Sequence, residues 1–140
     1  MTPFRNPPDD TIRKLLVEAK TIAVVGASSK PTRPSFDIFR YLLRAGYRVF
    51  PVNPGEKDVF GQRAYASLAD LPETVDIVNV FRRSELTPAV ATEAVAHGAK
   101  VLWLQLGVSS DEAAAIATAG GLTVVMNSCI KVDHRQLVYT

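Results

Sequence analysis

Five short runs of apolar and β-branched residues recur along the chain and predict the strands of a sheet. They occupy residues 21–25, 48–52, 75–81, 100–105 and 122–126. Most of these runs are apolar without alternation, which is typical of strands that are covered on both faces in a parallel sheet.

Segments with helical periodicity lie between the runs. In residues 34–45 the apolar residues recur at i, i+3, i+4 and i+7, while charged residues take the other face. Pro34 suits the first turn of this helix and Gly46 suits the position after its end. The other predicted helices are an opening helix over residues 9–19, one that begins at Thr87 and closes at Gly98, and one that begins at a capping box of Ser109 and Glu112 and ends at Gly120 and Gly121.

The alternation of strands and helices predicts an α/β fold, a three-layer Rossmann-like sandwich around a five-stranded parallel sheet. The expected strand order is 3-2-1-4-5, with its switch point between strands one and four, where such sheets bind ligands at the carboxyl ends of their strands. The segment 55–72 is expected to be an irregular crossover with one helical turn at 67–71. A length of 140 residues fits a single domain over residues 1–140.

Composition narrows the possible partners. The formal net charge of +2 favours neither a nucleic acid nor a membrane surface. The single cysteine excludes an internal disulfide, and with only two histidines a zinc site is not expected. No apolar stretch approaches the roughly 20 residues of a membrane span, and no signal-peptide pattern opens the chain, so a cytoplasmic location is expected.

The loop after the first strand has the features of a phosphate site. Small residues, Gly26-Ala27-Ser28-Ser29, follow the strand, and Arg33 comes just before the next helix. Small residues let backbone N–H groups approach an anion, the helix N-terminus adds a favourable dipole, and a guanidinium pairs well with phosphate. The alternative is a tight strand-to-helix turn with a solvated arginine.

Two common nucleotide fingerprints are absent. The dinucleotide pattern G-x-G-x-x-G fails because Ser28 and Pro31 stand where it needs glycine. That pattern also needs an acid at the end of the second strand, where the chain has Asn53 instead. The phosphate-loop pattern G-x-x-x-x-G-K-[ST] fails at Lys30, which has no glycine before it. A plain NAD site is therefore disfavoured.

Polar residues also follow the later strands. Arg82 and Arg83 are adjacent after a buried run, so one is expected to face a ligand while the other caps or pairs at the surface. Gln105 and Asn127 end apolar runs, where each could hydrogen-bond a ligand or satisfy loop backbone.

Catalytic candidates are few. A lone thiol such as Cys129 is more often an inert small hydrophobe than a nucleophile. His97 ends a helix and is expected to serve the helix dipole or nothing, and His134 is expected at the surface of a polar tail segment. No G-x-S-x-G elbow and no base–nucleophile spacing is present, so the sequence indicates binding rather than catalysis.

Taken together, the strand ends give the chain a close resemblance to the small stand-alone CoA-binding proteins. Their fold is similar to the CoA-binding Rossmann domain of the succinyl-CoA synthetase α subunit. The resemblance runs from about Ile12 to Leu137. The stretches that carry it are IAVVGASSKPTRPS, GYRVFPVNPGE, YASLADLP, VDIVNVFRR, GAKVLWLQLGV and GLTVVMNSCIKVDHRQL.

The resemblance implies CoA or an acyl-CoA as the ligand. It places Gly26, Ala27, Ser28, Arg33 and Ser35 around the phosphates, Val52, Asn53 and Pro54 near the adenosine, Phe81 and Arg82 beside the pantetheine path, and Gln105 and Gly107 farther along that path. A full ligase also carries a phosphorylated histidine in a second domain and a nucleotide-binding subunit, neither of which this sequence contains. The ligase reaction is therefore not implied.

The expected function is a binding or regulatory module for CoA or acyl-CoA without chemistry of its own. Two alternatives use the same pocket. One is a small enzyme with Cys129 or Lys131 as the reactive group, and the other is an NAD(P)-linked redox sensor.

Overall fold

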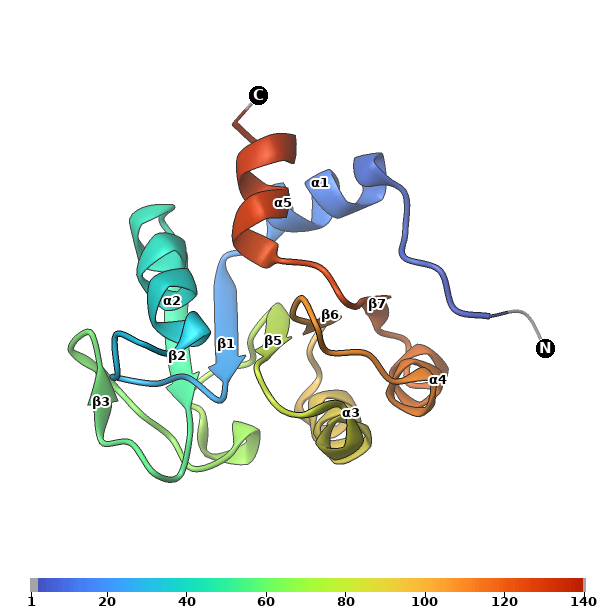
Figure 1. Ribbon diagram of the computed structural model, residues 1–140. Coiled ribbons are helices and arrows are strands. Elements are labelled where there is room, and N and C mark those ends of the chain that lie inside the picture. Colours follow the sequence, from blue (N-terminus) through green and yellow to red (C-terminus); the bar gives the residue numbers. More distant parts are fainter. Residues whose placement is uncertain (1–2, 140) are drawn as a thin grey trace.

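The computed structural model describes residues 3–139 and has a five-stranded parallel sheet at its centre (Figure 1). The strands pair in the order β2-β1-β5-β6-β7. Their bounds are β1 Thr21–Val25, β2 Arg48–Val52, β5 Ile77–Val80, β6 Val101–Leu104 and β7 Thr123–Val125. A separate two-stranded hairpin is formed by β3 Asp58–Val59 and β4 Gln62–Arg63.

Helices cover both faces of the sheet. They are α1 Asp9–Glu18, α2 Pro34–Arg44, α3 Thr87–His97, α4 Asp111–Ala119 and α5 Ile130–Leu137, with 3-10 turns η1 Leu68–Asp70 and η2 Ser84–Leu86. Helices α1, α2 and α5 pack on one face, and α3, α4 and η1 pack on the other (Figure 1). The expected three layers are therefore present.

Alternating strand residues build the two halves of the core. In β1, Ile22 and Val24 pack beneath α1, α2 and α5, whereas Ala23 and Val25 pack beneath α3 and α4. Trp103 in β6 is fully buried on the α1, α2 and α5 side, and its indole N–H donates to a backbone carbonyl 2.9 Å away. Because both faces of the strands are covered, the strand runs contain few polar positions.

The α/β class and the five parallel strands are confirmed. Tyr65 forms an isolated parallel bridge with Val52, the last residue of β2. The order keeps the 3-2-1-4-5 pattern if the segment at Tyr65 is counted as the third strand, next to β2. Counted over the five apolar runs alone the order is 2-1-3-4-5, because the third run, β5, pairs with β1. Burial explains this: every residue of β5 is buried, whereas β2 has an exposed Arg48 and includes Pro51, a residue type that sheets confine to edge strands.

The bounds of the four predicted helices agree with the sequence pattern except at one cap. Helix α4 is capped by Ser110, whose hydroxyl accepts the N–H of Ala113 at 3.0 Å. The prediction that Ser109 caps this helix was wrong by one residue, because the helix begins at Asp111 and Ser110 takes the cap position. Ser109 lies in the preceding loop, where its N–H donates to the hydroxyl of Ser84 at 3.0 Å. The shift moves the helix start without changing its packed face.

The segment 55–72 is more ordered than the sequence indicated. Its expected helical turn is η1, but the segment also contains the β3–β4 hairpin. Phe60 and Gly61 form the tip of this hairpin with positive φ angles. The Phe60 ring packs 4.5 Å from Phe36 and 6.1 Å from Phe39 on α2, measured between ring centroids. Aromatic packing on a distant helix therefore orders a segment that has little periodicity of its own.

Both histidines have roles that differ from those expected. His134 was expected at the surface of a polar tail, but residues 130–137 form α5, and its ring is buried with Nδ1 2.7 Å from the Tyr41 hydroxyl. The Nε2 of His97 accepts the N–H of Val75 at 3.0 Å, so this ring is a neutral acceptor rather than a cation serving the helix dipole. Burial lowers the pKa of each of these two histidines.

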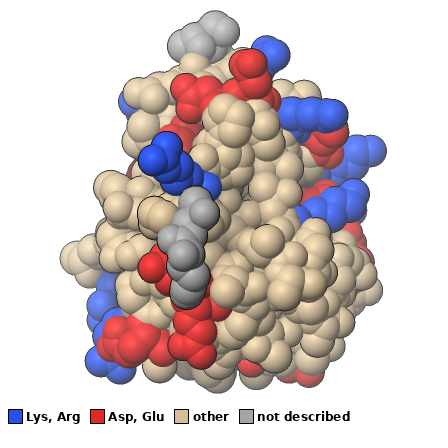
Figure 2. All heavy atoms as spheres, turned by 90° about the vertical axis from the view of Figure 1, so that its right-hand side faces the viewer, with Lys and Arg blue, Asp and Glu red and all other residues tan. Residues whose placement is uncertain are grey.

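Charges of both signs are interspersed on the face of the molecule shown in Figure 2, with broad uncharged areas between them. Such a mixture fits the small net charge. Among the helices of residues 3–139, none has the length and apolar character needed to cross a membrane.

Candidate functional site

A pocket of about 1010 Å³ lies at the carboxyl edge of the sheet. The loops after β1, β2, β5 and β6 line it, together with the first residues of α2 and the residue before α5. This is the edge at which parallel α/β sheets bind ligands, beside the switch point between β1 and β5. Eight of the residues expected at the site line the pocket: Gly26, Ser28, Arg33, Ser35, Asn53, Phe81, Arg82 and Gln105.

The β1–α2 loop (residues 26–33) is held tightly against the sheet at Gly26. The N–H of Gly26 donates to the carbonyl of Val52 at 2.8 Å, and the hydroxyl of the buried Ser35 donates to the carbonyl of Gly26 at 3.3 Å. Gly26 has a φ of +91°, and a Cβ at this position would lie 2.6 Å from the carbonyl oxygen of Phe81. Glycine is therefore needed both for the backbone angle and for the close approach.

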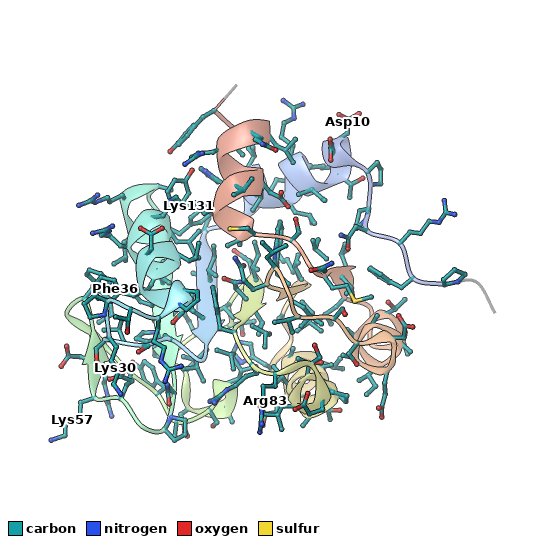
Figure 3. The ribbon with its side chains drawn as sticks, in the orientation of Figure 1. Asp10, Lys30, Phe36, Lys57, Arg83 and Lys131 are labelled. Carbon is teal, nitrogen blue, oxygen red and sulfur yellow. The ribbon has the colours of Figure 1, made fainter. Side chains whose placement is uncertain are left out.

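Four cationic side chains line the pocket: Lys30, Arg33, Arg82 and Arg83. Figure 3 shows Lys30 and Arg83 on the side of the molecule where β1 ends. Arg83 pairs with Glu85 at 3.5 Å, whereas Lys30, Arg33 and Arg82 make no ion pair within residues 3–139. Of the two arginines after β5, Arg83 is therefore paired, whereas Arg82 lines the pocket without an ion pair within the described residues. An anionic ligand is the natural counterpart of these cations.

Asn53 joins the two loops that form the adenosine end of the expected site. Its Nδ2 donates to the carbonyl of Ala27 at 2.9 Å, and its Oδ1 accepts the N–H of Gly55 at 2.9 Å. The side chain lines the pocket while it holds the β1–α2 loop against the end of β2. Asn53 therefore positions the loops in addition to any ligand contact.

A hydrogen-bonded amide chain forms the base of the pocket. The Oε1 of Gln105 accepts the Nδ2 of Asn79 at 3.2 Å and the backbone N–H of Ile130 at 3.3 Å. Because two donors occupy this oxygen, the Gln105 side chain can offer a ligand only its N–H groups. The pocket base would therefore favour a ligand carbonyl over a ligand donor.

The other expected residues lie around the pocket without lining it. Ala27 and Val52 are buried in the two halves of the core, and Pro54 and Gly107 are exposed. The N–H of Gly107 donates to the Oδ1 of Asn127 at 2.8 Å. Asn127 therefore satisfies loop backbone, which was one of the two roles considered for it.

Sequence reasoning missed two carboxylates in the lining, Asp37 and Glu56. Hydrogen bonds from Lys131 and then Arg40 lower the pKa of Asp37. Glu56 accepts hydrogen bonds from the backbone N–H and the hydroxyl of Ser29, and these bonds hold its pKa below the usual range. No local signal could have revealed Glu56, because it reaches across 27 residues of sequence to the β1–α2 loop.

Cys129 lines the pocket as the residue before α5 and is half-buried. Lys131 is held by Asp37, with Nζ 2.7 Å from the carboxylate (Figure 3). Within residues 3–139 no group of three His, Cys, Asp or Glu side chains could hold a metal ion.

Comparisons with known proteins agree with this fold. The chain is 42% identical to protein YneT of Bacillus subtilis, itself uncharacterized, over 94% of this chain and 97% of that protein. It is 32% identical to the α subunit of an ADP-forming acetate–CoA ligase from Pyrococcus furiosus, over 62% of this chain but only 20% of that subunit. A structure of a hypothetical protein from Pyrococcus horikoshii superposes with a TM-score of 0.92 at 38% identity, covering 99% of each chain.

The match therefore extends over whole small proteins and over one domain of larger ligases, as the sequence resemblance implied. All residues that line the pocket lie within residues 20–135. The chain belongs to the family described as the CoA binding domain, which matches residues 20–135.

Proposed function

We propose that this protein binds CoA or an acyl-CoA in the pocket at the carboxyl edge of the sheet, as a cytoplasmic single-domain binding or regulatory module. The observation that carries the proposal is the set of three cations in the pocket lining that make no ion pair within the described chain. Lys30 and Arg33 belong to the β1–α2 loop, and Arg82 follows β5. The chain that presents them is a member of the CoA binding domain family. CoA carries three phosphate groups, and cations at a loop-to-helix junction are suited to bind them.

The order of the lining residues suggests how the ligand would lie. The phosphates would meet the β1–α2 loop and Arg33 at the start of α2, and the adenosine would lie near Asn53 at the end of β2. The pantetheine arm would then run past Phe81 and Arg82 toward Gln105. The N–H groups of Gln105 suit an amide or thioester carbonyl, since its oxygen is already occupied.

Binding without catalysis is the form of the proposal that the lining supports best. Its one thiol, Cys129, has no histidine beside it in the lining. Lys131, the other candidate for a reactive group, is engaged with Asp37. Activated nucleophiles generally have a base within hydrogen-bond reach.

Calorimetry with CoA, dephospho-CoA and NAD tests the proposal. CoA should bind most tightly, dephospho-CoA less tightly because it lacks one phosphate, and NAD least. Mass spectrometry of the natively purified protein would identify any retained CoA species and its acyl group. NAD binding as tight as CoA binding, or no measurable CoA binding, would overturn the proposal.

A further inference from the structure

The carboxylate of Glu56 occupies donors of the β1–α2 loop at Ser29, between the two lining residues Ser28 and Lys30. Its Oε2 lies 2.6 Å from the backbone nitrogen of Ser29, and its two oxygens lie 2.8 and 3.0 Å from the Ser29 hydroxyl. Glu56 itself lines the pocket. A backbone N–H and a hydroxyl converging on one anion are the kind of contact that a phosphate oxygen makes in such a loop.

The charge of Glu56 opposes that of the proposed ligand. It stands in the same lining as Lys30 and Arg33, and it brings a negative charge into a pocket whose cations otherwise favour a polyanion. Glu56 is half-buried, follows the exposed Gly55 and belongs to neither half of the core. A ligand phosphate that uses the Ser29 donors must first displace this carboxylate.

We infer that Glu56 is an internal competitor for the phosphate-binding donors of Ser29, and that it lowers the affinity of the pocket for phosphate-bearing ligands. The inference rests on the proposed function, because it takes the pocket to be a phosphate site. It makes Glu56 a specificity-determining residue, since a ligand part that carries no phosphate does not compete with it. In a free protein the carboxylate keeps the loop donors satisfied, and in a complex the phosphate replaces it.

A different role for Glu56 predicts that its removal lowers the affinity for CoA instead of raising it. A carboxylate beside the end of the second strand can also accept hydrogen bonds from the hydroxyls of a ribose. In that case Glu56 would stabilise the bound adenosine, and its removal would weaken binding of adenosine and CoA alike. The sign of the effect therefore separates the two roles.

Calorimetry of the whole protein with CoA, adenosine and pantetheine provides the test, with Glu56→Gln as the main variant. Glu56→Gln keeps the side-chain size and removes the charge, and Glu56→Ala removes the contact altogether. Glu18→Gln is the matched control, because it changes the net charge equally at the end of α1, before β1 begins and away from the loop. Thermal unfolding of each variant checks that it is folded.

CoA should bind Glu56→Gln and Glu56→Ala about tenfold more tightly than the wild-type protein, which is the size expected when one competing charge-assisted contact is removed. Adenosine, pantetheine and the Glu18→Gln control should show no such gain. The amide resonance of Ser29 should also shift when CoA is added to the wild-type protein, as the carboxylate leaves.

Unchanged or weaker CoA binding by folded Glu56→Gln, while the wild-type protein binds CoA, would overturn this inference and leave the proposed function standing. Absence of CoA binding by the wild-type protein and by every variant would overturn both.

Discussion

Gly26 lies against Phe81 so closely that a Cβ on Gly26 would be 2.6 Å from the carbonyl oxygen of Phe81. The two residues directly follow the neighbouring strands β1 and β5, and both line the pocket. Gly26→Ala should therefore destabilise the protein by more than ~1 kcal/mol, because it adds a steric clash to the strain of a positive φ. Thermal or urea unfolding measures the loss.

Gly46→Ala is the matched control for this substitution. Gly46 has a similar φ of +104°, but a Cβ there would meet nothing within 4 Å. Its replacement should show the backbone strain alone. Equal losses at the two glycines would mean that the close approach to Phe81 has no energetic consequence.

Arg33→Ala should weaken CoA binding by roughly 10- to 150-fold, the equivalent of losing about 1.5–3 kcal/mol from a charge-assisted contact. Arg33→Lys should restore only part of the affinity, because it keeps the charge but not the forked geometry of the guanidinium. Arg44→Ala, at the opposite end of α2, serves as the control. CoA affinity that is indifferent to Arg33→Ala would count against the proposed phosphate site.

CoA affinity should fall as salt is raised from about 0.1 M to about 1 M, where the Debye length shrinks from ~10 Å to ~3 Å. The cations in the lining are exposed or half-buried, so salt can screen them. Adenosine, which has no phosphate, is the comparison ligand. A CoA affinity as insensitive to salt as that of adenosine would contradict an electrostatic site.

Cys129→Ser should leave the affinity for CoA unchanged, because the thiol is half-buried in the pocket lining and a hydroxyl is of similar size. Calorimetry of the variant beside the wild-type protein checks this. A loss of more than about tenfold, or about 1.4 kcal/mol, would show that the thiol takes part in binding.

The free energy of unfolding should fall as the pH drops from about 7 to about 5. Burial lowers the pKa of His97 below its ordinary value of 6.5, and its Nε2 accepts the N–H of Val75 only when that nitrogen is unprotonated. The stability that neutral His97 contributes is present above the unfolded pKa and is lost as the pH falls through the folded one.

Urea unfolding at several pH values, on wild-type protein and on His97→Gln, measures this dependence. The free energy of unfolding of the variant should fall less than that of the wild-type protein over this pH range. The buried His134 should account for a further part of the fall, because burial lowers its pKa too. A His97→Gln variant with the full wild-type pH dependence would disprove the assignment to His97.

Local patterns were sufficient to predict most of the elements. Helix α2 begins at Pro34 and is followed by Gly46, because the fixed φ of proline and the positive φ allowed to glycine act within a single turn. The strands were recognisable because both of their faces are covered, which leaves continuous apolar runs. The β1–α2 loop could be singled out as a candidate phosphate site because its small residues and Arg33 lie within eight positions of one another.

Helix α5 was missed because its pattern is short and polar. Only Ile130 and His134 are buried in it, and a buried histidine is not distinguishable from an exposed one by sequence. Packing against α1 and α2 decides that this segment is helical and that its histidine lies under Tyr41. Short helices depend on such packing more than on their own propensity.

The sequence by itself determined the fold class, the five main strands, four of the helices and the cationic loop at the strand ends, because each depends on residues within a few positions of one another. The tertiary structure decided which run lies beside β1, and it brought Glu56 onto Ser29 and Gln105 onto Ile130. These contacts join residues 25 or more positions apart. Their geometry is set by strand order and crossover path, which local propensity does not encode.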